Sequence, residues 1–226
     1  MHGHARALLH NGMNLVSLFT RADNIVGIDI GEEYLRLAVL HKEKDGTERI
    51  SLLASEKVSP QTVVGGVVRN TESLARHLRN LAKNVATGRS RTRITYAIVS
   101  VPADTAYSRV YGFPSSIKGS RLEETMDLTV GFQLPVKIED VYLDWEKVPH
   151  GGKNEVFLAA MKKPVVDGYI GALRAAGINP VAIELYPQSV ARAIAPGDAP
   201  RVVVSDSPSG ITASVIVDGI ARFTRV

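Results

Sequence analysis

A short strand end, Gly27-Ile28-Asp29-Ile30-Gly31, carries the clearest chemistry in this 226-residue sequence. A glycine lets the backbone approach phosphate oxygens, and the amides of a tight turn point toward them. A carboxylate such as that of Asp29 can hold a hydrated magnesium ion, so the segment is a candidate phosphate and metal site. The same Asp-x-Gly pattern also closes many ordinary hairpins, and both interpretations stand at this point.

The composition excludes several other kinds of site. The chain has no cysteine, which excludes disulfides, thiolate-bound zinc, iron–sulfur clusters and a cysteine nucleophile. Its six histidines are scattered, and none has a helical partner at the spacing of metal ligands. The sequence identifies no catalytic base, and we do not expect a metal enzyme.

The charge pattern gives no sign of nucleic-acid binding. The net charge of +4 is a small excess of 27 basic over 23 acidic residues, and the densest basic stretch, residues 89–93, has no aromatic residues among its arginines. No run approaches the roughly 20 apolar residues that cross a bilayer, and the N-terminus lacks the pattern of a secretory signal. We therefore expect a cytoplasmic protein, with residues 1–23 as a disordered leader.

Several strands and helices must position the glycine-rich segment. Residues 24–40 predict a β-hairpin around Asp29 and Gly31, and residues 49–55 return as a third strand. Thr71 is the expected N-cap of the next helix. The further predicted elements are a helix at 71–85, a covered strand at 94–101, an edge strand at 109–114, a helix at 121–130, strands at 141–148 and 155–161, a helix at 164–176 ended by Gly177, a strand at 181–184, a helix at 188–194 and a hairpin of 201–205 with 213–217.

Taken in order, these segments resemble the actin-like ATPases. Val26-Gly27-Ile28-Asp29-Ile30-Gly31 is similar to their first phosphate loop. Later segments resemble the family of the type IV pilus assembly protein PilM, a relative of FtsA: among them are residues 98–102, 132–136, 139–145 and 175–184. The matches run over residues 24–226, and their combination is more specific than any one piece.

The resemblance implies an α/β fold built around an actin-like lobe. We expect the actin-like (ribonuclease H-like) first lobe at 24–108 and an inserted α+β subdomain at 109–180. A return helix and linker would follow at 181–200, and residues 201–226 would be the incomplete start of a second lobe.

The resemblance also implies a function. Members of the family are cytoplasmic scaffolds, peripheral to the inner membrane, that bind ATP and magnesium between two lobes. They capture the N-terminal cytoplasmic tail of a PilN-like membrane protein, alongside other proteins of the type IV pilus platform. The positions that match the nucleotide loops are Asp29, Gly31, Glu32, Glu33, Asp206 and Gly210, with magnesium held by Asp29 only when ATP is bound.

Three departures from the family weaken the nucleotide site. Glu32 and Glu33 stand where the family has small hydroxyl residues, and two carboxylates repel a polyphosphate. Pro208 takes the place of a glycine in the second loop and removes an amide. The chain also ends at Val226, before the family's adenosine-contacting segment. We therefore expect nucleotide binding to be weakened or lost, in a chain that is either a fragment of a longer gene product or a shortened protein, with open strand edges that favour self-association.

The expected contact with the membrane partner lies at Phe132, Leu134 and Pro135, because a proline beside an apolar loop presents a rigid, exposed ridge. Trp145 is expected in the core. For Asp29 and Asp206, turn or capping roles stay open as the alternative to a magnesium pair. The rival functions are a working ATPase of the same fold, in type II secretion for example, and an FtsA-like cell-division protein.

Overall fold

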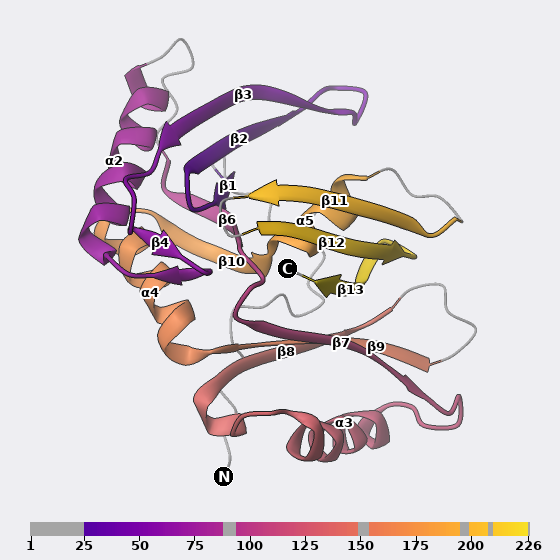
Figure 1. Ribbon diagram of the computed structural model, residues 1–226. Helices are drawn as coiled ribbons and strands as arrows, with labels where there is room; N and C mark the ends of the chain where they lie inside the picture. Colours follow the sequence, from indigo (N-terminus) through magenta and orange to yellow (C-terminus); the bar gives the residue numbers. More distant parts are fainter. Residues whose placement is uncertain (1–24, 88–93, 149–153, 195–198, 208–209, 226) are drawn as a thin grey trace.

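A meander of three antiparallel strands begins the described chain and forms one side of a five-stranded sheet (Figure 1). The computed structural model describes residues 25–87, 94–148, 154–194, 199–207 and 210–225. The predicted leader, residues 1–23, and the basic stretch at 89–93 lie outside the described residues. The sheet has the order β10-β6-β1-β2-β3, with β6 parallel to both β1 and β10; its strands are β1 (Ile25–Ile30), β2 (Tyr34–Lys42), β3 (Glu48–Lys57), β6 (Tyr96–Val101) and β10 (Asn179–Leu185).

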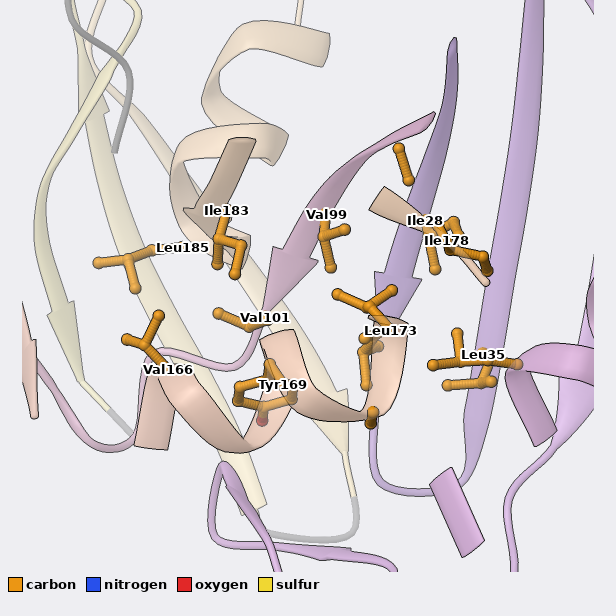
Figure 2. Packing of buried hydrophobic residues seen from close by; sticks show 14 of the residues in the cluster. Ile28, Leu35, Val99, Val101, Val166, Tyr169, Leu173, Ile178, Ile183 and Leu185 are labelled. Atoms are coloured by element: carbon orange, nitrogen blue, oxygen red, sulfur yellow. The ribbon is translucent and has the colours of Figure 1, made fainter. Parts of the chain in front are cut away.

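Two helices cover one face of this sheet, α2 (Thr71–Thr87) and α4 (Lys163–Ala175), which also pack on each other. Strand alternation turns Val26, Ile28 and Ile30 of β1 toward them, and all three are buried. Figure 2 shows Tyr169 and Leu173 of α4 meeting the apolar side chains of the sheet. The predicted hairpin at 24–40 and the first predicted helix are thus confirmed.

The ends of the two helices use different capping groups. The side-chain oxygen of Asn70 accepts a hydrogen bond from the Ser73 amide at 2.8 Å, so Asn70 caps α2 and the predicted role of Thr71 is wrong. Thr71 is instead the first residue of the helix. At the end of α4, Gly177 has φ +79° and the Ile178 amide bonds the Leu173 carbonyl, which confirms the predicted glycine cap.

A small hairpin lies between β3 and α2 and is tied to α4. Its strands are β4 (Val63–Val64) and β5 (Val67–Val68), and Gly65 and Gly66 form the turn with positive φ. The fully buried Tyr169 donates its hydroxyl proton to the Gly66 carbonyl at 3.0 Å. Burial, together with the nearby carboxylates of Asp104 and Glu32, raises the pKa of Tyr169, which keeps the hydroxyl protonated.

A second sheet follows β6 and has its own helix. Its order is β7-β9-β8, from β7 (Ala106–Phe113), β8 (Val141–Lys147) and β9 (Asn154–Lys162), and the edge position expected for the first of these is confirmed. Helix α3 (Ser120–Gln133) covers one face, followed by the short 3-10 helix η1 (Ile138–Asp140). The second core joins α3 to this sheet through Tyr111, Leu122, Met126, Val130, Val156 and Leu158.

The chain returns to the first sheet with α4, which buries Val165, Val166 and Tyr169 in the first core. We therefore propose that the inserted unit spans β7 to β9 rather than the 109–180 expected from the sequence.

Helix α5 (Tyr186–Ala193) leads from β10 to a third sheet. This sheet has the order β11-β12-β13, from β11 (Arg201–Ser207), β12 (Gly210–Val217) and β13 (Ile220–Arg225). Its last strand had no counterpart among the predicted elements. The sheet packs on α5 through a third cluster that includes Ala191, Ile216 and Ala221. None of the helices in the described ranges is long and apolar enough to cross a membrane.

The Tyr169 hydroxyl gives a test of how firmly the β4–β5 turn is held. In Tyr169→Phe the buried Gly66 carbonyl loses its donor, so we expect the free energy of unfolding to fall by about 1–2 kcal/mol. The matched control is Tyr142→Phe, because the Tyr142 hydroxyl donates to Asp167 at an exposed site, and we expect less than about 0.5 kcal/mol there. Urea titration followed by circular dichroism measures both. Equal losses of unfolding free energy in the two variants would contradict a larger contribution from the buried hydrogen bond.

Candidate functional site

A cleft of about 710 Å³ lies where the first and third sheets meet across α5. The end of β1 and the turn after it form one wall, and Pro102, Ala103 and Asp104 after β6 extend it. Tyr186 and Ser189 of α5 contribute the floor, and the β11–β12 hairpin contributes the opposite wall. The cleft therefore gathers side chains from segments that are distant in the sequence.

Asp29 is paired with an arginine inside this cleft. The strand register places Asp29 opposite Arg36, and the guanidinium donates to the carboxylate at 3.1 Å. The Asp29 side chain is 26% exposed. Burial raises the pKa of Asp29, and the hydrogen bond and positive charge of Arg36 oppose that rise only in part. Arg36 thus supplies the positive charge that a magnesium ion would bring to this carboxylate.

Gly31 closes the β1–β2 turn tightly. Its amide donates to the Tyr34 carbonyl at 3.0 Å, and an added Cβ would lie only 3.1 Å from that oxygen. Only glycine fits this turn without a backbone shift. The amide that the phosphate-loop interpretation would use is therefore already engaged within the hairpin.

The two glutamates after Gly31 have different surroundings. Glu32 accepts a hydrogen bond from the Gly65 amide at 2.6 Å, so its carboxylate holds the β4–β5 turn against the cleft loop. Glu33 is exposed, and its backbone carbonyl accepts from the Val58 amide at 2.7 Å. Both residues line the cleft.

The second predicted loop reaches the cleft only in part. Asp206 lines the wall that faces the β1–β2 turn, whereas Gly210 pairs with Ser207 at the start of β12 and does not line the cleft. Gly210 has φ +128°, a conformation that favours glycine. Pro208 lies outside the described residues.

The charges around the cleft are unbalanced. Five carboxylates face one guanidinium among the lining residues: the acids are Asp29, Glu32, Glu33, Asp104 and Asp206, and the base is Arg36. Within the described part of the chain, no group of three or more His, Asp or Glu side chains has metal-ligand geometry. The sequence indicated four of these acids but missed Arg36 and Asp104. Strand pairing across the hairpin was the signal available for Arg36.

The predicted partner residues lie outside this cleft. Phe132 is 86% exposed near the end of α3, Pro135 is exposed, and Leu134 is half-buried against the second core. Trp145 is half-buried as well, so the prediction that it lies in the core is only partly confirmed. It lines a small groove of about 80 Å³ between β8–β9 and β10–α5, with Phe157 and Leu185.

The first sheet, its two covering helices and the cleft at its edge define an actin-like, ribonuclease H-like fold, as expected from the sequence. The family model described as "Type IV pilus assembly protein PilM" matches residues 27–205, and the chain belongs to that family. A search of curated proteins finds no match.

One solved structure supports this fold, and two others are more distant. A chain of the "PilM-PilN type IV pilus biogenesis complex" is 21% identical with a TM-score of 0.72, and the match covers 91% of this chain and 61% of that one. This chain therefore spans about three-fifths of the length of that relative. A Bacteroides thetaiotaomicron protein with an actin-like ATPase fold is 10% identical, with a TM-score of 0.39 and coverage of 92% and 70%. The Aquifex aeolicus PPX-GPPA enzyme is 14% identical, with a TM-score of 0.40 and coverage of 89% and 50%.

The buried carboxyl in the cleft predicts a pH effect of defined sign. The folded-state pKa of Asp29 lies above its ordinary value of 3.8, so its contribution to stability is full below that value and is lost as the pH rises through the folded pKa. Asp29→Asn cannot ionise, and its stability relative to wild type should therefore rise with pH in the acidic range and then level off.

The control for this prediction is Asp45→Asn. Hydrogen bonds from Thr47 lower the pKa of Asp45, so here the relative stability of the variant should fall as the pH rises. Denaturant titrations from acidic to neutral pH give both slopes. A relative stability of Asp29→Asn that is flat or falling over this range would contradict the assignment of burial as the dominant influence.

Proposed function

We propose that this protein is a cytoplasmic scaffold of the type IV pilus inner-membrane platform that binds the N-terminal cytoplasmic tail of a PilN-like membrane protein. The observation that supports this most is the family match over residues 27–205. The shared fold with a chain of a PilM–PilN complex agrees with it. In this role the protein is peripheral to the membrane and contacts other platform proteins through its partner.

The contact with the tail is proposed at the end of α3. The inner side chains of this helix, Leu122, Met126 and Val130, already fill the second core. Phe132 and Leu128 lie one helical turn apart on the outside and are 86% and 64% exposed. Because folding does not require these two side chains, an exposed aromatic beside the rigid Pro135 is well suited to anchor a short apolar peptide.

The groove at Trp145 is a second place where the tail could bind. Trp145, Phe157 and Leu185 give it an apolar lining, and Asp144 and Glu146 lie at its side. This groove joins the second sheet to β10 and α5. A tail with apolar residues and a basic side chain matches it as well, so both places must be tested together.

Peptide binding tests the function and its location. A synthetic peptide with the sequence of the partner's cytoplasmic tail should bind the wild-type chain in calorimetric titration. Phe132→Ala should weaken binding by roughly tenfold or more if α3 holds the anchor. Tyr96→Ala is the matched control, since Tyr96 is another exposed aromatic, on β6, and it should leave the affinity unchanged.

Two results would redirect this proposal. Loss of binding in Trp145→Ala with Phe132→Ala and Leu134→Asp unaffected would move the site to the groove. The absence of any binding by the folded wild-type chain would remove the proposed function itself.

We further propose that nucleotide binding is weakened in this chain. The cleft lies between the first and third sheets, where the family resemblance would put a nucleotide. Its lining carries four more acidic than basic side chains, and like charges near contact repel strongly at low dielectric. The Gly31 amide is engaged by Tyr34, and Arg36 neutralises the carboxylate that would hold magnesium. These contacts favour a scaffold over a working ATPase of the same fold, in type II secretion or FtsA-like cell division.

Titration with magnesium-ATP tests this part. We expect a dissociation constant no tighter than about 1 mM, equivalent to about 4 kcal/mol. The control is Glu33→Ser, which removes one exposed carboxylate from the cleft and should strengthen any residual binding. Micromolar affinity of the wild-type chain would contradict the proposal and support the ATPase alternative.

A further inference from the structure

His77 is a nearly buried titratable side chain that links helix α2 to the end of strand β3. Its side chain is 10% exposed. The ring nitrogen Nδ1 lies 3.2 Å from a carboxylate oxygen of Glu56 on β3, and Nε2 lies 3.1 Å from the amide nitrogen of Ser59, just after that strand. Figure 1 shows this end of β3 beside α2. The ring therefore joins the helix to a segment 18 to 21 residues earlier in the sequence.

The Ser59 amide fixes the protonation state of this ring. A backbone N–H can only donate, so the Nε2 atom that it contacts must accept and carries no proton. The proton of the neutral ring is then on Nδ1, where it donates to the Glu56 carboxylate. Asn80 donates to the same carboxylate oxygen at 3.2 Å and holds it in place. The hydrogen bond at Ser59 thus requires a neutral His77.

The turn that follows β3, residues 59–62, is strained and is attached to α2 at both ends. Gln61 has φ +64°, in the left-handed region that a residue with a Cβ rarely adopts. At the start of the turn, the Ser59 amide bonds His77. At its end, the Thr62 hydroxyl lies 3.0 Å from the Ser73 hydroxyl of α2, and both residues are buried. Loss of the first attachment would leave the second in place.

We propose that His77 is a pH-sensitive switch that closes and opens the turn at residues 59–62. The neutral ring holds the turn closed through the Ser59 amide. The protonated ring carries hydrogen on both nitrogens and cannot accept that bond, so the turn opens at Ser59 and the strain at Gln61 is released. Histidine is the side chain that changes charge between about pH 5 and 8, so acidification through this range opens the turn.

Two neighbouring groups allow the ring to gain a proton without leaving its place. The Glu56 carboxylate, 3.2 Å from Nδ1, supplies the counter-charge. The Ser59 hydroxyl oxygen, 3.0 Å from Nε2, has lone pairs and can accept a hydrogen bond from the Nε2–H of the protonated ring. Protonation therefore transfers the hydrogen bond from the backbone of Ser59 to its side chain, and the change stays local.

The other charged groups on the elements around the ring are directed elsewhere. Helix α2 packs against β2, β3 and α4. On β2, Arg36 is engaged in the cleft, and on β3 alternation turns Lys57 to the face opposite Glu56. The charged side chains of α4 interact with Tyr142 of β8: Lys163, Asp167 and Arg174. On α2 itself, the residues one turn to either side of the ring are uncharged. Glu56 is thus the charged group in contact with the ring.

Hydrogen exchange of individual amides, followed by NMR from about pH 8 to about pH 5, tests the switch. The protection factor, which is corrected for the intrinsic pH dependence of exchange, should fall about fivefold at Ser59 on acidification, the equivalent of one hydrogen bond. The Arg69 amide is the internal control, because it donates to the Thr62 carbonyl at 2.9 Å. Its protection should stay constant, since the attachment at Thr62 is kept.

Two variants identify the titrating group. In His77→Gln the side-chain oxygen can still accept from Ser59 but gains no proton, so the protection of Ser59 should no longer depend on pH. His41→Gln is the matched control, since His41 is an exposed histidine on β2, and it should keep the change seen in wild type. Circular dichroism melts establish that both variants are folded.

Several results would overturn the proposal. A wild-type Ser59 amide whose protection is constant over this pH range removes the switch. An equal fall at the Arg69 amide shows a general loosening instead of an opening at one end of the turn. A pH dependence at Ser59 that persists in His77→Gln, or that disappears in His41→Gln, assigns the titration to another group.

Discussion

The parallel pairing of β1, β6 and β10 is the constraint on which the cleft depends. The registers align Asp29 with Ser100 and Ser100 with Glu184, so the carboxyl ends of three strands meet at one edge. An open sheet of this kind places its ligand crevice at that edge. Glu184 also bonds Ser189 and Arg192 of α5, which fixes the floor of the cleft to the same row. Backbone pairing thus brings the polar side chains of the site to one edge, where their own contacts hold them.

Local patterns in the sequence were sufficient for the first hairpin and the helices. The strand pattern over residues 24–40 predicts the hairpin around Asp29 and Gly31, and Gly177 predicts the end of α4. Strand β13 was missed although Asp218-Gly219 is a strong turn signal, because Ile220–Arg225 is short and lies at the end of the chain. The cap of α2 was placed one residue late because Asn70 and Thr71 are both good capping residues, and only the geometry separates them.

The sequence predicted most of the acidic residues that line the cleft but not what each of them contacts. Asp29, Glu32, Glu33 and Asp206 do line one cleft. The partner of Glu32 is an amide 33 residues away, at Gly65, and no local spacing in the sequence indicates that contact. A sequence motif gives the residues near a ligand, whereas the charge balance that decides between ligands is set by long-range pairs such as Asp29 with Arg36.

Strand β9 links the second sheet to the first sheet. Its alternate side chains enter different cores: Phe157 and Met161 join the first, and Val156 and Leu158 join the second. A fixed strand cannot turn one face without turning the other, so a rotation of the α3 unit would disturb the packing of both cores. Arg222 of β13 also forms a salt bridge with Glu155 of β9 at 2.7 Å, which connects the third sheet to the same strand. A peptide held at the proposed site on α3 or at the Trp145 groove would therefore bear on a strand in contact with all three sheets.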